Sequence, residues 1–189
     1  MVDKVEQNEI IFHHVMMPRT VMCFTIPLPD LLREKSIHEA MKIGDEMNHS
    51  TNVKASMSNY EVHKTTDVYH DILVEITRMT KRAPWLDPDY VGYTLVNSWT
   101  GIYTEGDHTI PHVHHAAASF CYYIQADESA SPLVFDGTPL EIKPFTGLCV
   151  MFEGGMMHSV PRQEYGSGKP RIILAGNFET DITSWETEK

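Results

Sequence analysis

The spacing of apolar residues changes near Pro84, and this change constrains the fold more than any other feature of the chain. Before Pro84, apolar residues recur three and four positions apart, as on one face of a helix. After Tyr90, short alternating segments follow one another, separated by turns such as Asp136-Gly137. Many short strands in this arrangement predict a sandwich, jelly roll or barrel. We expect strands at about 90–99, 111–116, 118–125, 132–136, 139–143, 147–153, 157–162 and 170–178.

Two helices are expected before Pro84. The segment Ser36-Ile37-His38-Glu39 has the form of a capping box and predicts a helix over about 36–48. A second amphipathic helix should start near Thr66 or Asp67. Its apolar face would carry Val68, Ile72, Ile76 and Met79.

The length of 189 residues fits one domain with an adequate core. We therefore expect a single, mainly β domain over 1–189. Residues 1–89 would supply an N-terminal strand and flanking helices that pack on a barrel core at 90–180. The helices would lie outside the sheet.

Charge and cysteine content limit the partners and the location. The formal net charge is −11, which argues against binding to nucleic acid or to an anionic membrane. Cys23, Cys121 and Cys149 are far apart with no C-x-x-C pair, which is typical of reduced thiols. The polar, acidic N-terminus does not resemble a signal peptide, and no apolar run approaches a membrane span. We therefore predict a cytoplasmic protein. The sequence does not fix the oligomeric state, although the methionine-rich segment Val15-Met16-Met17 favours an interface, as in a homodimer.

A group of histidines predicts a metal site. His112 and His114 are two residues apart, so in a strand both imidazoles would point to one face, about 7 Å apart along the chain. His158 follows an apolar strand and a glycine turn, which makes it the natural third ligand. Three protein ligands leave open positions on the metal, as in a catalytic site. The alternative is that the histidine-rich segment is a polar turn facing solvent.

Three other residues are candidates for ligand binding. Arg171 begins a strongly β-prone run whose face is otherwise apolar, and a buried guanidinium needs an anionic partner. A structural salt bridge or a strand-end arginine in solvent would explain it equally well. Asn97 interrupts an apolar strand face that runs from Val91 to Trp99, so its side chain either satisfies backbone groups or projects into a pocket. Tyr122 and Tyr123 point to opposite faces, so one of them, Tyr123 in our prediction, could hydrogen-bond a ligand.

The C-terminal half resembles the 2-oxoglutarate/Fe(II)-dependent oxygenase superfamily, and more closely the oxygenases common in marine bacteria and their phages. The resemblance covers roughly half of the chain, and the order of its motifs is specific. It implies a double-stranded β-helix (jelly-roll or cupin-like) barrel with His112 and His158 as iron ligands. It also implies that Arg171 grips the distal carboxylate of 2-oxoglutarate. The matching residues are Asn97-Ser98-Trp99, Gly106-Asp107, Pro111-His112-Val113-His114, Ser119-Phe120-Cys121-Tyr122-Tyr123, Pro144, Gly147, Val150-Met151-Phe152, His158-Ser159-Val160, Arg171 and Asn177-Phe178.

The second ligand departs from the family pattern. The usual motif is H-x-D, and this chain has His114 at the aspartate position. An all-histidine site changes the charge on the metal and could favour another metal. Asp107 is the nearest upstream carboxylate that could replace it. We predict His114 as the ligand because its spacing from His112 is right.

The resemblance implies a non-haem Fe(II) dioxygenase that uses 2-oxoglutarate as co-substrate. Such an enzyme would hydroxylate an unidentified small molecule or protein and release succinate and carbon dioxide. One alternative is a cupin-type metalloenzyme, a three-histidine dioxygenase or an isomerase, that does not use 2-oxoglutarate, because Gly106 and His112-x-His114 also fit the first cupin motif. A further alternative is a non-catalytic jelly roll that binds a metal.

Overall fold

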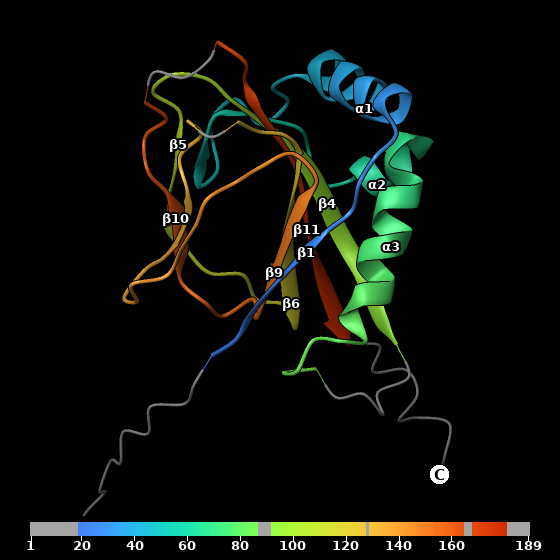
Figure 1. The fold of residues 1–189 in the computed structure, drawn as a ribbon, viewed down its shortest axis with the longest axis vertical. Helices are drawn as coiled ribbons and strands as arrows, with labels where there is room; N and C mark the ends of the chain where they lie inside the picture. The colour runs from blue at the N-terminus through green and yellow to red at the C-terminus, as the bar shows by residue number, and fades with distance from the viewer. Residues whose placement is uncertain (1–18, 87–91, 128, 165–167, 181–189) are drawn as a thin grey trace, which may run out of the picture.

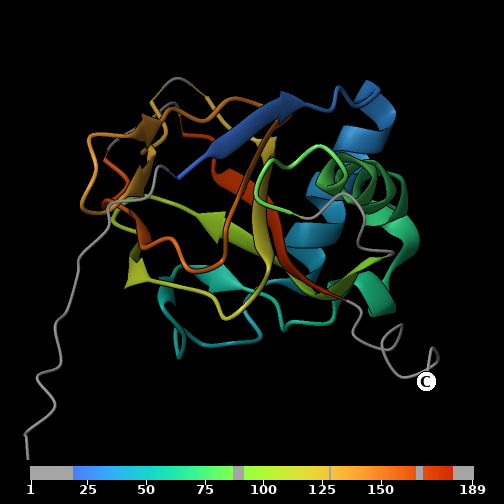
Figure 2. The same ribbon diagram turned by 90° about the horizontal axis from the view of Figure 1, so that it is seen from below.

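The computed structural model describes residues 19–86, 92–127, 129–164 and 168–180. In these ranges, two antiparallel β-sheets face each other, as Figures 1 and 2 show. This arrangement confirms the predicted mainly β jelly roll with N-terminal helices. Val91 and the segment Val15-Met16-Met17 lie outside the described residues.

The strands after Pro84 match the predicted ones, with bounds shifted by a few residues. The larger sheet contains β1 (Val21–Thr25), β3 (Ser56–Met57), β4 (Tyr93–Tyr103), β6 (Ala118–Gln125), β9 (Leu148–Phe152) and β11 (Arg171–Thr180). The smaller sheet contains β2 (Val53–Lys54), β5 (His108–His112), β7 (Leu133–Phe135), β8 (Glu141–Ile142) and β10 (His158–Val160). The strand orders are β1–β9–β6–β11–β4–β3 and β2–β5–β10–β7–β8.

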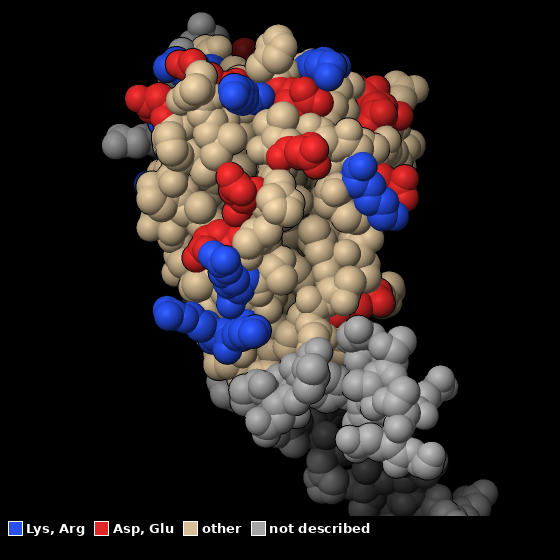
Figure 3. Space-filling view, turned by 90° about the vertical axis from the view of Figure 1, so that its right-hand side faces the viewer, with Lys and Arg blue, Asp and Glu red and all other residues tan. Residues whose placement is uncertain are grey.

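The helices cover the outer face of the larger sheet (Figure 1). They are α1 (Asp30–Ile43), α2 (Val62–Thr65), a short 3-10 helix, η1 (Asp67–Tyr69), and α3 (His70–Thr80). The backbone N–H of Val68 donates to Thr66 Oγ1, which caps η1 at the predicted place. Figure 3 shows that acidic and basic side chains are interspersed on this side of the molecule.

The first helix begins earlier than the sequence predicts. It starts at Asp30, so Ser36 lies inside it and is fully buried. The Ser36 hydroxyl donates to the carbonyl oxygen of Leu32 at 2.9 Å, and the predicted capping box is therefore wrong. The helix ends at Ile43 because Gly44 adopts a φ of 67°, a region that glycine enters without steric cost.

The central strands of the larger sheet, β6, β9 and β11, are largely buried on both faces, because the helices cover one face and the smaller sheet covers the other. Successive residues of a strand point to opposite faces. On β11, Ile172, Leu174 and Phe178 belong to the core under the helices. Ile173 and Ala175 belong to the core between the sheets. We call these two surfaces the helix-side face and the inter-sheet face.

A β-bulge changes the face on which the residues of β4 lie. Tyr93 and Leu95 pack against the helix-side core, whereas Trp99 belongs to the inter-sheet core. Two consecutive residues of β11 pair with Asn97 and Leu95, which leaves Val96 as the extra residue of the bulge. The prediction of one continuous face from Tyr93 to Trp99 is therefore wrong.

The N-terminal part of the chain supplies strands to both sheets. β1 pairs with β9, from Val21 opposite Phe152 to Thr25 opposite Leu148. β2 pairs with β5 and β3 pairs with β4, so the chain passes from one sheet to the other at Ala55. The sequence pattern does not predict β2 or β3, since two residues are too few to show alternation. Within the described ranges, no helix has the length and apolar character needed to cross a bilayer.

Candidate metal centre

His112, His114 and His158 come together between the two sheets. Each offers a ring nitrogen, and these three atoms lie within 4.8 Å of one another. The ring centroids are 4.3 Å apart for His112 and His158, and 5.1 Å apart for His114 and His158. The structure therefore gathers the three residues that the sequence suggested as ligands.

His112 and His158 lie opposite each other on neighbouring strands, β5 and β10. Nδ1 of His112 is 2.9 Å from the carbonyl oxygen of Ile110. Nδ1 of His158 is 2.8 Å from the carbonyl oxygen of Met156. Because a carbonyl only accepts, both rings hold their proton on Nδ1 and leave the Nε2 lone pair available. This orientation by a backbone carbonyl is typical of histidines that bind metals.

His114 reaches the cluster by another route than strand alternation. β5 ends at His112, so His114 lies in the following loop. Its backbone N–H donates to the carbonyl oxygen of Gly154 at 2.7 Å, which ties the loop to the turn between β9 and β10. A Cβ on Gly154 would collide with the carbonyl oxygen of Ala116 and lie 2.9 Å from that of His114. The close approach of these two segments therefore requires glycine at position 154.

Burial keeps the three imidazoles neutral. Desolvation, together with the smaller effects of the charges of His158 and His112, lowers the pKa of His114 to about 3. Desolvation also lowers the pKa of His158 to about 4 and lowers the pKa of His112. A neutral imidazole can donate a lone pair to a metal at pH 7, whereas a protonated one cannot.

Arg171 lies in the same cavity as the histidines, a space of about 50 Å³. Arg171 is buried, with only 3% of its surface exposed to solvent. Nη1 donates to the carbonyl oxygen of Ser131 at 2.9 Å, and the guanidinium carbon is 3.9 Å from the centroid of the Tyr103 ring. Its Nε has no hydrogen-bond partner, and no ion pair joins it to a carboxylate of the described residues. A buried cation without an anion is costly, so this arrangement fits an anionic ligand.

Buried hydroxyl groups line the cavity near Arg171. Tyr123 is 1% exposed, and the Tyr103 hydroxyl shares a 2.7 Å hydrogen bond with Thr109 Oγ1. Desolvation raises the pKa of Tyr103 and raises that of Tyr123 well above its usual value, so both remain neutral phenols. Tyr122 points to the helix-side face, where its hydroxyl donates to the carbonyl oxygen of Ile26 at 2.9 Å. Of the two tyrosines, Tyr123 is therefore the one beside the histidines.

Asn97 is not among the residues that line the cavity. Its Oδ1 accepts from Asn177 Nδ2 at 2.8 Å, and Asn177 Oδ1 accepts from the Ser119 hydroxyl at 2.7 Å. This chain of hydrogen bonds joins β4, β11 and β6 and explains the polar residue on structural grounds. The geometry does not support the predicted role of Asn97 in ligand binding.

Asp107 is also separate from the histidines. Its Oδ2 accepts from the backbone N–H of Thr104 at 2.7 Å and from the Thr104 hydroxyl at 3.0 Å, which closes a turn. The cluster found in the described ranges contains three histidines and no carboxylate. The structure therefore places His114, and not Asp107, beside His112 and His158.

The sequence does not predict two residues that help to position Arg171. Tyr103 shares a face with Trp99, a signal that becomes readable only once the bulge at Val96 is known. Gln163 is 8% exposed, and its Oε1 accepts from the backbone N–H of Ser131 at 2.9 Å. It thereby holds the residue whose carbonyl receives Arg171, and no local pattern marks it.

Solved structures with a similar fold include prolyl hydroxylases and the protein HygX. The chain is similar to the viral collagen prolyl hydroxylase of Paramecium bursaria Chlorella virus-1 in complex with 2OG, with a TM-score of 0.65 and 13% identity over 85% of this chain and 96% of the other. A prolyl-4-hydroxylase of Pseudomonas putida gives a TM-score of 0.64 and 14% identity over 86% and 94% of the two chains. HygX from Streptomyces hygroscopicus, with nickel, 2-oxoglutarate and hygromycin B bound, gives a TM-score of 0.64 and 9% identity over 86% of this chain and 83% of HygX.

No family model and no curated protein matches the chain by sequence. At these low identities, the structural likeness establishes the fold. The chain therefore has the jelly-roll fold of these 2-oxoglutarate-binding proteins, in agreement with the resemblance of its motifs.

Proposed function

We propose that this chain is a non-haem Fe(II)- and 2-oxoglutarate-dependent oxygenase. It would hydroxylate its substrate and release succinate and carbon dioxide. One observation carries the proposal: a single cavity holds three neutral imidazoles and a buried guanidinium that lacks an anionic partner. The imidazoles can bind a metal, and the guanidinium can bind a carboxylate of a ligand that also contacts this metal.

The three histidines fit Fe(II). His112, His114 and His158 would supply nitrogen ligands from one side and leave other positions open. When bound, the iron supplies the activation of oxygen, and 2-oxoglutarate supplies the electrons for it. The backbone carbonyls of Ile110 and Met156 hold two of the rings in the required tautomer.

Arg171 would bind the distal carboxylate of 2-oxoglutarate. Its stacking on Tyr103 and its bond to Ser131 fix the plane of the guanidinium, so two parallel hydrogen bonds to a carboxylate are pre-organised. Tyr123 would donate from its neutral hydroxyl to the same ligand. The apolar walls, which include Trp99 and Phe152, exclude water and strengthen these polar contacts.

The substrate class stays open. The metal ion and 2-oxoglutarate would occupy the cavity between the sheets, so the substrate would approach from outside it. A neighbouring HygX structure holds hygromycin B, and a Trichoplax adhaerens prolyl hydroxylase holds a peptide fragment. A small molecule and a protein both remain candidates here. The net charge of −11 argues against nucleic acid. A cytoplasmic location and a homodimer remain predictions.

The test is an anaerobic titration of Fe(II)-loaded protein with 2-oxoglutarate, followed by the visible charge-transfer band of the chelate. We expect a saturable band that is lost in His158→Ala. It should need far more 2-oxoglutarate in Arg171→Ala. Absence of the band in folded, Fe(II)-loaded protein would overturn the proposal.

A cupin-type metalloenzyme is the second candidate, favoured by the all-histidine ligand set. It would bind the metal through the same residues and ignore 2-oxoglutarate. Metal binding without the band, unaffected by Arg171→Ala, would support this candidate. A metal that binds without any reaction with oxygen would indicate the non-catalytic jelly roll.

A further inference from the structure

The proposed ligands carry no charge of their own. His112, His114 and His158 are neutral at pH 7 because burial lowers the pKa of each. An H-x-D site would give a divalent metal one ligand carboxylate, and this chain gives none. A 2+ ion between the sheets would therefore leave its charge uncompensated by its protein ligands.

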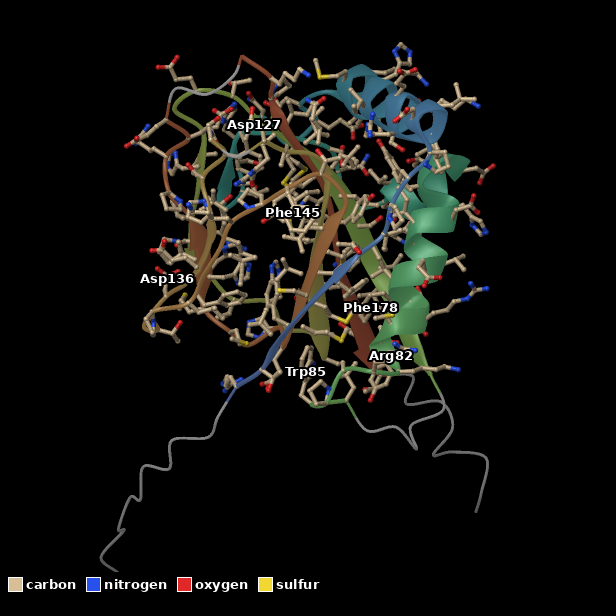
Figure 4. All side chains as sticks on the ribbon, viewed as in Figure 1. Arg82, Trp85, Asp127, Asp136, Phe145 and Phe178 are labelled. Atoms are coloured by element: carbon tan, nitrogen blue, oxygen red, sulfur yellow. The ribbon has the colours of Figure 1, made fainter. Side chains whose placement is uncertain are left out.

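Asp136 is a carboxylate beside two of these histidines. It directly follows β7, whose last residue, Phe135, lies opposite His158 in the sheet. The backbone N–H of Asp136 donates to the carbonyl oxygen of Met157 at 3.0 Å. Figure 4 shows Asp136 next to β10, on the sheet far from the helices. Its position is thus fixed by backbone pairing with the strand that begins at His158.

The carboxylate of Asp136 has an unsatisfied oxygen. Oδ2 is buried and has no hydrogen-bond partner, and no salt bridge found in the described ranges includes Asp136. Arg19 lines the same surface depression, of about 400 Å³, but its guanidinium is paired with Glu153. A buried carboxylate oxygen without a partner costs free energy, and such an exception calls for an explanation.

The negative charge of Asp136 acts on the histidine cluster. The carboxylate of Asp136 interacts electrostatically with both His112 and His158, which places it close enough to act on an ion that these rings bind. A negative charge at that range favours a metal cation on the histidines. The metal would in turn stabilise the buried Oδ2.

We propose that Asp136 is a positioning residue that supplies, from outside the ligand set, the negative charge that His114 does not supply. This inference rests on the proposed metal site. Asp136 would raise the affinity of the three histidines for a divalent cation without contacting it. In the metal-free protein, Oδ2 of the same carboxylate has no hydrogen-bond partner.

The experiment measures Co(II) binding to metal-free protein by its visible absorption and by competition with a chelator. In Asp136→Asn, we expect the dissociation constant to rise by roughly 10- to 100-fold, the usual effect of an outer carboxylate. In Asp136→Glu, which keeps the charge, most of the affinity should return. Glu141→Gln is the matched control, since it removes one charge from an exposed residue of the adjacent strand β8.

Thermal unfolding of the metal-free protein separates this role from a purely structural one. We expect Asp136→Asn to unfold at the same temperature as the wild type or higher, and to gain less from Co(II). A structural role would lower the unfolding temperature with or without the metal. Unchanged Co(II) affinity in Asp136→Asn would overturn this inference and leave the proposed function intact. If the wild type bound neither Co(II) nor Fe(II), both would fall.

Discussion

On β11, Ile172, Leu174 and Phe178 face the helices, whereas Arg171 and Ile173 face the smaller sheet. The helix-side face is apolar and fully buried at these three positions. The inter-sheet face is equally buried but contains a guanidinium and, across the cavity, the histidine cluster. Alternate residues of one strand therefore serve packing on one side and ligand binding on the other. The expected consequence is that helix-side substitutions cost stability, and inter-sheet substitutions cost affinity.

The largest effect on stability should come from Phe178→Ala, on the helix-side face (Figure 4). Phe178 is fully buried, so we expect a loss of about 3–5 kcal/mol in the free energy of unfolding. Urea denaturation measures it. Phe145→Ala is the control, because Phe145 is 48% exposed and should change stability by less than about 0.5 kcal/mol. Equal effects of the two variants would contradict the assignment of the helix-side core.

On the inter-sheet face, His158→Ala should weaken metal binding strongly and change stability little, the opposite of Phe178→Ala. Metal affinity should fall by more than about 100-fold, or roughly 3 kcal/mol, because one of three ligands is removed. The stability of the metal-free protein should change far less than in Phe178→Ala. Isothermal titration with Fe(II) or Co(II) measures the affinity. His115→Ala is the control, since His115 is exposed, and it should bind metal as the wild type does.

Arg171→Met tests the second polar feature of the inter-sheet face. The affinity for 2-oxoglutarate should fall by about 10- to 100-fold, since a charge-assisted hydrogen bond contributes about 1.5–3 kcal/mol. Fe(II) affinity should not change. Arg162→Met removes an exposed arginine and serves as the control. Loss of Fe(II) binding together with 2-oxoglutarate binding would show a structural role for Arg171 instead.

The smallest effect expected is a pH dependence of stability confined to the inter-sheet face. The pKa of His158 is about 4 in the folded protein and near 6.5 when unfolded, so the unfolded state binds the proton first as pH falls. The contribution of His158 is fully present above pH 6.5 and is lost as pH falls through the folded pKa. It should amount to about 1–2 kcal/mol between pH 7 and 5 in metal-free protein. Urea unfolding at several pH values should show a shallower slope for His158→Ala; an identical slope would refute this.

Gly154→Ala tests whether backbone packing alone positions His114, because it leaves all three histidines in the sequence. A Cβ there would push apart the segments that carry His114 and Ala116. We expect weaker metal binding with the other two histidines still in place. Gly155→Ala, where nothing lies within 4 Å of the added Cβ, is the matched control.

The sequence predicted much of the β-fold because its signals are local. Alternation of apolar residues indicates a strand whatever its partners are. β6 and β9 therefore lie where the sequence pattern predicts them. The S-x-x-E pattern at Ser36 misled because a serine inside a helix can bond back to the preceding turn. The two-residue strands β2 and β3 carry no alternation and are defined only by their partners.

By itself, the sequence determined the residue types of the site, three histidines and an arginine in a specific order, and the strand pattern that carries them. Only the tertiary structure decided how they meet. The bulge at Val96 sets which side of β4 faces the cavity, and the Gly154 carbonyl, rather than strand alternation, brings His114 to the cluster. The unpaired groups of Arg171 and Asp136 also appear only there, because burial and missing partners are properties of the whole packed chain and not of any local segment.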